Sequence, residues 1–159
     1  MKVLTKTDIG KARSMNQDSF LVSENKDNGL NLYILADGMG GYKGGEIASK
    51  VAIQAVSKFI TEKFDDISKD KQSILDLLED AIAFANSAIY EESEEDEELQ
   101  DMGTTLEVLA IFKGKIYIED SNDNLTISSF LGGGIRFLPN GKMDTDGELL
   151  IGDDGKSIF

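Results

Sequence analysis

The stretch LYILADGMGGYKGGEIAS, from Leu32 to Ser49, constrains the fold of this chain more than any other. A short apolar run ends at Asp37, and five glycines then lie within the eight positions from Gly38 to Gly45. A tight strand-to-helix turn explains the glycines, because glycine adopts positive φ angles without steric cost. A backbone that must lie close to a ligand, with the aspartate holding it, explains the glycines and Asp37 together. The residues alone leave both interpretations open.

Apolar spacing along the chain predicts strands, then two consecutive helices, then more strands. Asp27-Asn28-Gly29 is a hairpin signal, and Lys113-Gly114 is a second one. This order is typical of the α+β class, with a sheet covered by a helix pair, and we expect one domain over residues 1–159. Strands are predicted at 3–8, 18–23, 32–35, 104–112 and 115–118, and helices at 45–60 and 72–90, with further hairpins beyond residue 118.

An acidic run, EESEEDEELQD, covers residues 91–101, and eight of its eleven side chains are carboxylates. Runs of like charge repel and stay in water, so we predict a solvated helix end followed by a loop. The alternative is a binding site for extra cations or for a partner.

Composition excludes several classes of chemistry. The chain has no cysteine and no histidine, which removes disulfides, thiolate zinc sites and the serine–histidine–aspartate triad. A net charge of -14 disfavours a nucleic-acid partner and suits oxygen-ligated Mg2+ or Mn2+. No apolar run approaches the roughly 20 residues of a membrane span, and the N-terminus does not resemble a signal peptide. We expect a cytoplasmic protein that contacts neither nucleic acid nor membrane.

Three motifs occur in the order TDIGKARSMNQDSFLV, LYILADGMGGYKGGEIASKVA and MGTTLEVLAIFKGKIYI. In this order and spacing they resemble the metal-dependent PPM (PP2C-type) protein serine/threonine phosphatases, particularly the bacterial ones. The resemblance covers about residues 6–118, and residues 119–159 diverge. It implies a PP2C-like β-sandwich with a flanking antiparallel helix pair, incomplete at the C-terminal end.

The resemblance also implies site residues and a mechanism. Asp37 stands where the family's aspartate bridges two Mn2+ or Mg2+ ions, and Gly38 stands where a carbonyl binds one of them. Arg13 occupies the position of the arginine that binds the substrate phosphate, and Asp18 that of an aspartate that orders metal-bound water. The family's reaction is attack of metal-activated water on phosphorus, which needs neither cysteine nor histidine.

The likeness weakens after Ile118. Asp123 falls at an aspartate position of the family, but the neighbouring glycine and arginine are replaced by Asn122 and Leu125. Within ELLIGDDGKSIF, Asp154 matches a further metal ligand, although a polar turn explains the same residues. The family's final Asp-Asn motif has no counterpart in the sequence.

These observations leave three hypotheses open. One is a monomeric phosphatase acting on phosphoserine or phosphothreonine proteins. Another is a non-catalytic remnant of the fold that serves as a binding or regulatory module or has no function. The third is an acidic α+β domain whose glycine loop is only a turn.

Overall fold

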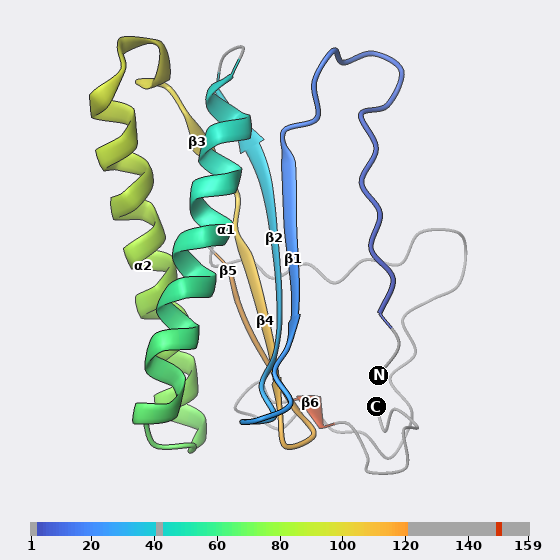
Figure 1. The fold of residues 1–159 in the computed structure, drawn as a ribbon, viewed down its shortest axis with the longest axis vertical. Coiled ribbons are helices and arrows are strands. Elements are labelled where there is room, and N and C mark those ends of the chain that lie inside the picture. Colours follow the sequence, from blue (N-terminus) through green and yellow to red (C-terminus); the bar gives the residue numbers. More distant parts are fainter. Residues whose placement is uncertain (1–2, 41–42, 121–148, 151–159) are drawn as a thin grey trace.

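The computed structural model describes residues 3–40, 43–120 and 149–150. Within them the chain forms two long helices, two short 3-10 helices and six strands (Figure 1). In chain order these are β1 (Asp18–Glu24), β2 (Asn31–Met39), α1 (Gly44–Lys63), η1 (Phe64–Asp66), α2 (Lys71–Glu95), η2 (Glu97–Leu99), β3 (Gly103–Thr104), β4 (Glu107–Phe112), β5 (Lys115–Asp120) and β6 (Leu149–Leu150).

The strands form one antiparallel sheet in the order β1-β2-β4-β5-β6, and β3 pairs with the end of β2. The predicted turns join its hairpins. Gly29, with φ +75°, closes the connection between β1 and β2, while Lys113 and Gly114 both have positive φ between β4 and β5. A two-residue loop with positive φ at both positions matches the twist of the strands that it connects.

Helices α1 and α2 run antiparallel and cover one face of the sheet, with α1 packed on β2 (Figure 1). Alternate residues of β2 are buried beneath them, among them Leu32, Ile34 and Ala36. The ring of Phe64 meets that of Phe112 edge to face, with 5.1 Å between centroids. Neither long helix of the described residues combines the length and apolar character needed to cross a membrane.

These elements confirm the α+β class and the helix pair, with shifts at element boundaries. The predicted second helix extends from residue 90 to Glu95, and Ser93 within the acidic run is buried. The predicted strand 104–112 is interrupted at Thr105 and Leu106, although β3 and β4 hold the same register against β2. The reason is local, because the Asp37 N–H donates to the Thr105 hydroxyl instead of a backbone carbonyl (3.2 Å).

The strand predicted at residues 3–8 is wrong for the described structure. These residues follow an extended path apart from β1, and no described strand pairs with them (Figure 1). Leu4 is 86% exposed. A strand exists only through hydrogen bonds to a neighbouring strand, so a segment with strand-forming residues but no partner stays merely extended.

Candidate metal centre

Asp18 and Asp37 are cross-strand neighbours at one end of the sheet. The register of β1 and β2 places them directly opposite each other. The adjacent pair is hydrogen-bonded, since the Gly38 N–H donates to the Gln17 carbonyl oxygen (3.1 Å). Asp18 and Asp37 therefore form a non-hydrogen-bonded pair, in which side chains on the same face approach most closely, with about 4.5–5.5 Å between Cβ atoms. Both carboxylates project from the face opposite the helices.

The residues before β1 hold Asp18 in place. The Thr7 hydroxyl donates to its carboxylate (3.1 Å), and the Asn16 amide donates in turn to Thr7 (2.8 Å). The side-chain oxygen of Asn16 also accepts the Asp18 backbone N–H (3.1 Å). These three hydrogen bonds join the N-terminal segment to the first carboxylate.

The backbone of Asp37 is held from the other side by Thr105. The Asp37 N–H donates to the threonine hydroxyl, and the Thr105 N–H donates to the Asp37 carbonyl (2.9 Å). These two hydrogen bonds use the N–H and the carbonyl of Asp37 but not its carboxylate. The Asp37 side chain is exposed.

The glycine loop then brings the end of β2 against the start of α1. A Cβ atom added to Gly38 would lie 1.9 Å from the carbonyl oxygen of Gly45, which is closer than any real contact. Gly40 has φ +108°, and its carbonyl accepts the Gly45 N–H (3.0 Å). The chain thus turns from strand to helix at van der Waals distance, which only glycine permits here.

The electrostatics of the pair favour a cation. Two carboxylates directly opposite each other on a sheet destabilise it. Within the described part of the chain, neither Asp18 nor Asp37 forms an ion pair with lysine or arginine. Carboxylate oxygens are the ligands that Mg2+ and Mn2+ prefer, so this donor set fits such an ion. Residues 3–40 and 43–120 bring no group of three acidic side chains into metal-binding geometry, so Asp18 and Asp37 are a pair of carboxylates without a third beside them in the described part of the chain.

The structure brings only some of the predicted site residues together. Asp18 and Asp37 come together, and Gly38 is buried beside them. Arg13 lies in the loop before β1 and is exposed. Asp154 lies outside the described residues, as does Asp123.

The sequence pattern does not single out the residues that hold the two aspartates in place. Thr7, Asn16 and Thr105 fix the two aspartates, yet each is a common polar residue with no spacing signal of its own. Thr105 lies within the MGTT stretch, which marks its neighbourhood but not its contact with Asp37. An open hollow of about 290 Å³ adjoins Asp18 between β1 and α1, and Lys50 on its wall is paired with Glu46 (2.6 Å).

The chain is similar in sequence and in fold to known proteins. The family model described as protein phosphatase 2C matches residues 10–119. The serine/threonine phosphatase stp of Listeria monocytogenes is 34% identical over 119 residues, which are 75% of this chain and 46% of that protein. The solved S. agalactiae serine/threonine phosphatase is 40% identical with a TM-score of 0.61, over 71% of this chain and 45% of that one.

A third relative carries metal. The catalytic domain of the phosphatase PstP, solved in complex with two manganese ions, is 31% identical with a TM-score of 0.59. The match covers 74% of this chain and 46% of that domain. The likeness confirms the PP2C-like fold with its helix pair, and this chain spans about half the length of the relatives that it matches. Among the described residues there is one sheet, so a second sheet of a sandwich is not among them.

Proposed function

Because this chain belongs to the protein phosphatase 2C family, we propose that it takes part in Mn2+- or Mg2+-dependent dephosphorylation of phosphoserine and phosphothreonine proteins. The observation that carries this proposal is the placement of Asp18 opposite Asp37 at one end of strands β1 and β2, next to Gly38, where a Cβ atom would meet the carbonyl of Gly45. Phosphoproteins made by a serine/threonine kinase are the implied substrates. We propose that the protein acts in the cytoplasm as a monomer.

The roles proposed for the residues are those that the family resemblance implies. Asp37 and the Gly38 carbonyl would hold metal, and Asp154 would add a further carboxylate. When bound, the ions supply positive charge that stabilises the phosphoryl oxygens and activates water. Asp18, held by Thr7 and Asn16, would orient that water by accepting its hydrogen bond. Arg13 would bind the phosphate, because its planar guanidinium matches two phosphate oxygens at once.

A phosphatase assay with an aryl phosphate tests the proposal directly. We expect weak hydrolysis that requires millimolar Mn2+, stops on chelation and resists thiol reagents. Asp37→Asn keeps the shape of the side chain and removes its charge, so it should abolish turnover. Arg13→Ala should reduce turnover through weaker phosphate binding. Turnover by the parent chain no greater than that of Asp37→Asn at every metal concentration would refute catalysis by this chain.

A second candidate function is a non-catalytic remnant of the fold. The absence of a three-carboxylate group within the described residues favours it, since affinity for a divalent ion depends on the number of charged ligands. Calorimetry with Mn2+ separates the candidates. A phosphatase binds Mn2+ and loses that binding in Asp37→Asn, whereas a remnant without a working site shows no Mn2+ binding in the parent chain.

A further inference from the structure

The glycine loop that follows Asp37 lies against the two residues that precede β3. A Cβ atom added to Gly40 would lie 2.2 Å from the carbonyl oxygen of Asp101 and 2.7 Å from the Cα of Met102. A Cβ atom added to Gly44, the first residue of α1, would lie 2.9 Å from the Cβ of Met102. Real Cβ atoms do not come this close to other atoms, so the loop is packed directly on this short segment on both sides of its turn.

The side chain of Met102 is buried in a small apolar cluster. It is 9% exposed and packs with Ala48 of α1 and Leu99 of η2. Ile47 and Ile89 line the same cluster and are partly buried. The buried members of this cluster do not belong to the main core between the sheet and the helices. A flexible, unbranched methionine suits such an irregular space, and its burial anchors the segment that touches the loop.

The residues after Met102 connect this anchor to the candidate metal centre. Strand β3 pairs antiparallel with Gly38 and Met39 at the end of β2. Thr105 then exchanges two hydrogen bonds with the backbone of Asp37. One continuous segment, with Met102 buried near its start, therefore runs along the end of β2 that carries the candidate metal ligands.

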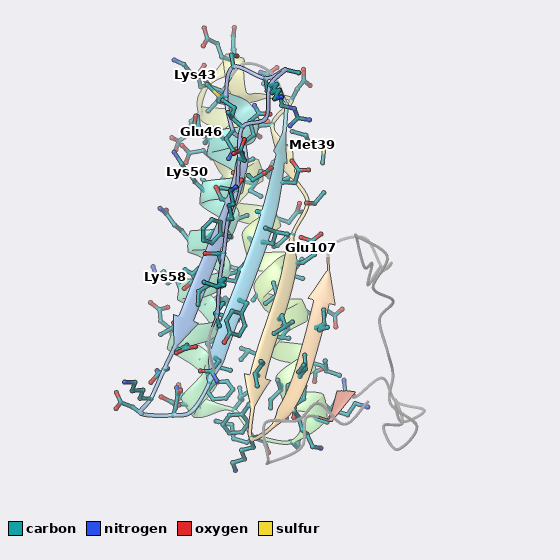
Figure 2. All side chains as sticks on the ribbon, turned by 90° about the vertical axis from the view of Figure 1, so that its right-hand side faces the viewer. Met39, Lys43, Glu46, Lys50, Lys58 and Glu107 are labelled. Atoms are coloured by element: carbon teal, nitrogen blue, oxygen red, sulfur yellow. The ribbon has the colours of Figure 1, made fainter. Side chains whose placement is uncertain are left out.

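We infer that Met102 is a positioning residue: its buried side chain holds the glycine loop against the end of β2 and thereby fixes Asp37 and the Gly38 carbonyl. Figure 2 shows Met39, at the end of β2, and Lys43, just before α1, at the same end of the molecule. Because its side chain packs on the helices, Met102 acts through the loop and not on a bound ligand. The consequence for metal binding rests on the proposed function, whereas the hold on the loop does not.

Hydrogen exchange followed by NMR tests the hold on the loop. The Gly45 N–H donates to the Gly40 carbonyl (3.0 Å), so its exchange reports opening of the loop. Val56 is fully buried in the middle of α1, and its amide reports unfolding of the whole structure. We expect Met102→Ala to speed exchange at Gly45 about tenfold more than at Val56, because local opening is separate from global unfolding. Met102→Leu conserves the volume of the side chain and should restore the parental rates.

Leu99→Ala is the matched control. Leu99 is 8% exposed in the same cluster, but the atoms nearest to Gly40 belong to the two residues before β3. Both truncations leave a cavity in the cluster, so we expect Leu99→Ala and Met102→Ala to lower the urea midpoint by similar amounts. Leu99→Ala should nevertheless leave the ratio of exchange at Gly45 and Val56 at its parental value.

Calorimetry with Mn2+ measures the consequence for the metal centre. We expect Met102→Ala to weaken Mn2+ binding about tenfold, as the loss of a group that orients a metal ligand does, and Leu99→Ala and Met102→Leu to stay within about twofold of the parent. A parent chain that binds no Mn2+ would refute the metal-binding part of the proposed function. The exchange ratio would then still decide whether Met102 holds the loop.

Two results would overturn the inference. One is an equal acceleration of exchange at Gly45 and Val56 in Met102→Ala, because the side chain would then contribute only to global stability. The other is a Leu99→Ala variant that loosens the loop as much as Met102→Ala does, since the cluster as a whole would then hold it. If Met102→Ala does not fold, Met102→Val keeps part of the side chain and gives the same comparison.

Discussion

The contact between Gly38 and Gly45 is the tightest feature of the candidate site at the scale of single residues. The end of β2 meets the first turn of α1 there with no side chain between them. Two backbones at this distance cannot separate without moving Asp37 or the helix. The glycine pair therefore fixes where the carboxylate stands relative to the helix that covers the sheet.

Adding one methyl group tests this contact. We expect Gly38→Ala to lower the free energy of unfolding by about 1–3 kcal/mol, because its Cβ would clash with the Gly45 carbonyl and force a backbone shift. Urea denaturation followed by circular dichroism measures the change. Gly103→Ala is the matched control, since its Cβ would meet only the Met39 side chain at an ordinary 3.5 Å. Equal stability of the two variants would show that the Gly38 contact is not tight in solution.

At the scale of elements, a helix cap at the start of α2 stabilises the connection between α1 and α2. Asp70 precedes α2, and its carboxylate accepts the Ser73 N–H (3.0 Å) and the Ser73 hydroxyl (2.9 Å). The Ser73 N–H, followed by the Ser68 and Ser73 side chains, lowers the pKa of Asp70 to about 2. Before the cap, the Lys69 ammonium donates to the carbonyl of Phe64, the first residue of η1, and to that of Ile67, which follows η1.

This cap predicts a pH dependence of stability. A carboxyl whose pKa is lower in the folded state stabilises the protein above its unfolded pKa of about 3.9, and that contribution is lost as the pH falls toward 2. We expect Asp70→Ala to unfold at lower urea than the parent at pH 7, and the gap to narrow between pH 4 and pH 2. Asp80→Ala removes the same charge from the exposed middle of α2 and should show no such narrowing. A gap that stays constant down to pH 2 would contradict the capping role.

The whole molecule combines a large negative charge with a partial site for a divalent cation. With a net charge of -14, the acidic side chains repel one another in the folded state, and any cation lowers that repulsion to some extent. A specific site differs from this general effect because it depends on one carboxylate pair. The stability of the whole chain therefore reports whether Asp18 and Asp37 act together.

Metal-dependent stability provides the corresponding prediction. An ion that binds only the folded state stabilises it by about 2.7 kcal/mol at a free concentration of 100 times Kd. We expect millimolar Mn2+ to raise the thermal midpoint of the parent and of Asp80→Asn, and to leave that of Asp37→Asn nearly unchanged. Differential scanning calorimetry measures these shifts. The same rise in all three proteins would show that Mn2+ acts only by neutralising the acidic surface.

Much of the element pattern was determined by the sequence. Apolar residues at helical spacing predicted α1 and most of α2, and the turn residues at Asn28-Gly29 and Lys113-Gly114 predicted both hairpins. These signals are local, because helix periodicity and turn chemistry act within a few residues of the chain. The three motifs likewise identified the family and the strand end that carries Asp37.

The tertiary structure decided which residues from distant parts of the chain lie in contact. Asp18 faces Asp37 only because β1 and β2 pair in one register, and a shift of one residue would turn one of them to the helix side. Thr105 holds Asp37 from 68 residues away, which no local pattern encodes. The strand predicted at residues 3–8 failed for the same reason. Its residues form a strand only where a partner supplies hydrogen bonds, and pairing is a property of the folded chain and not of the segment.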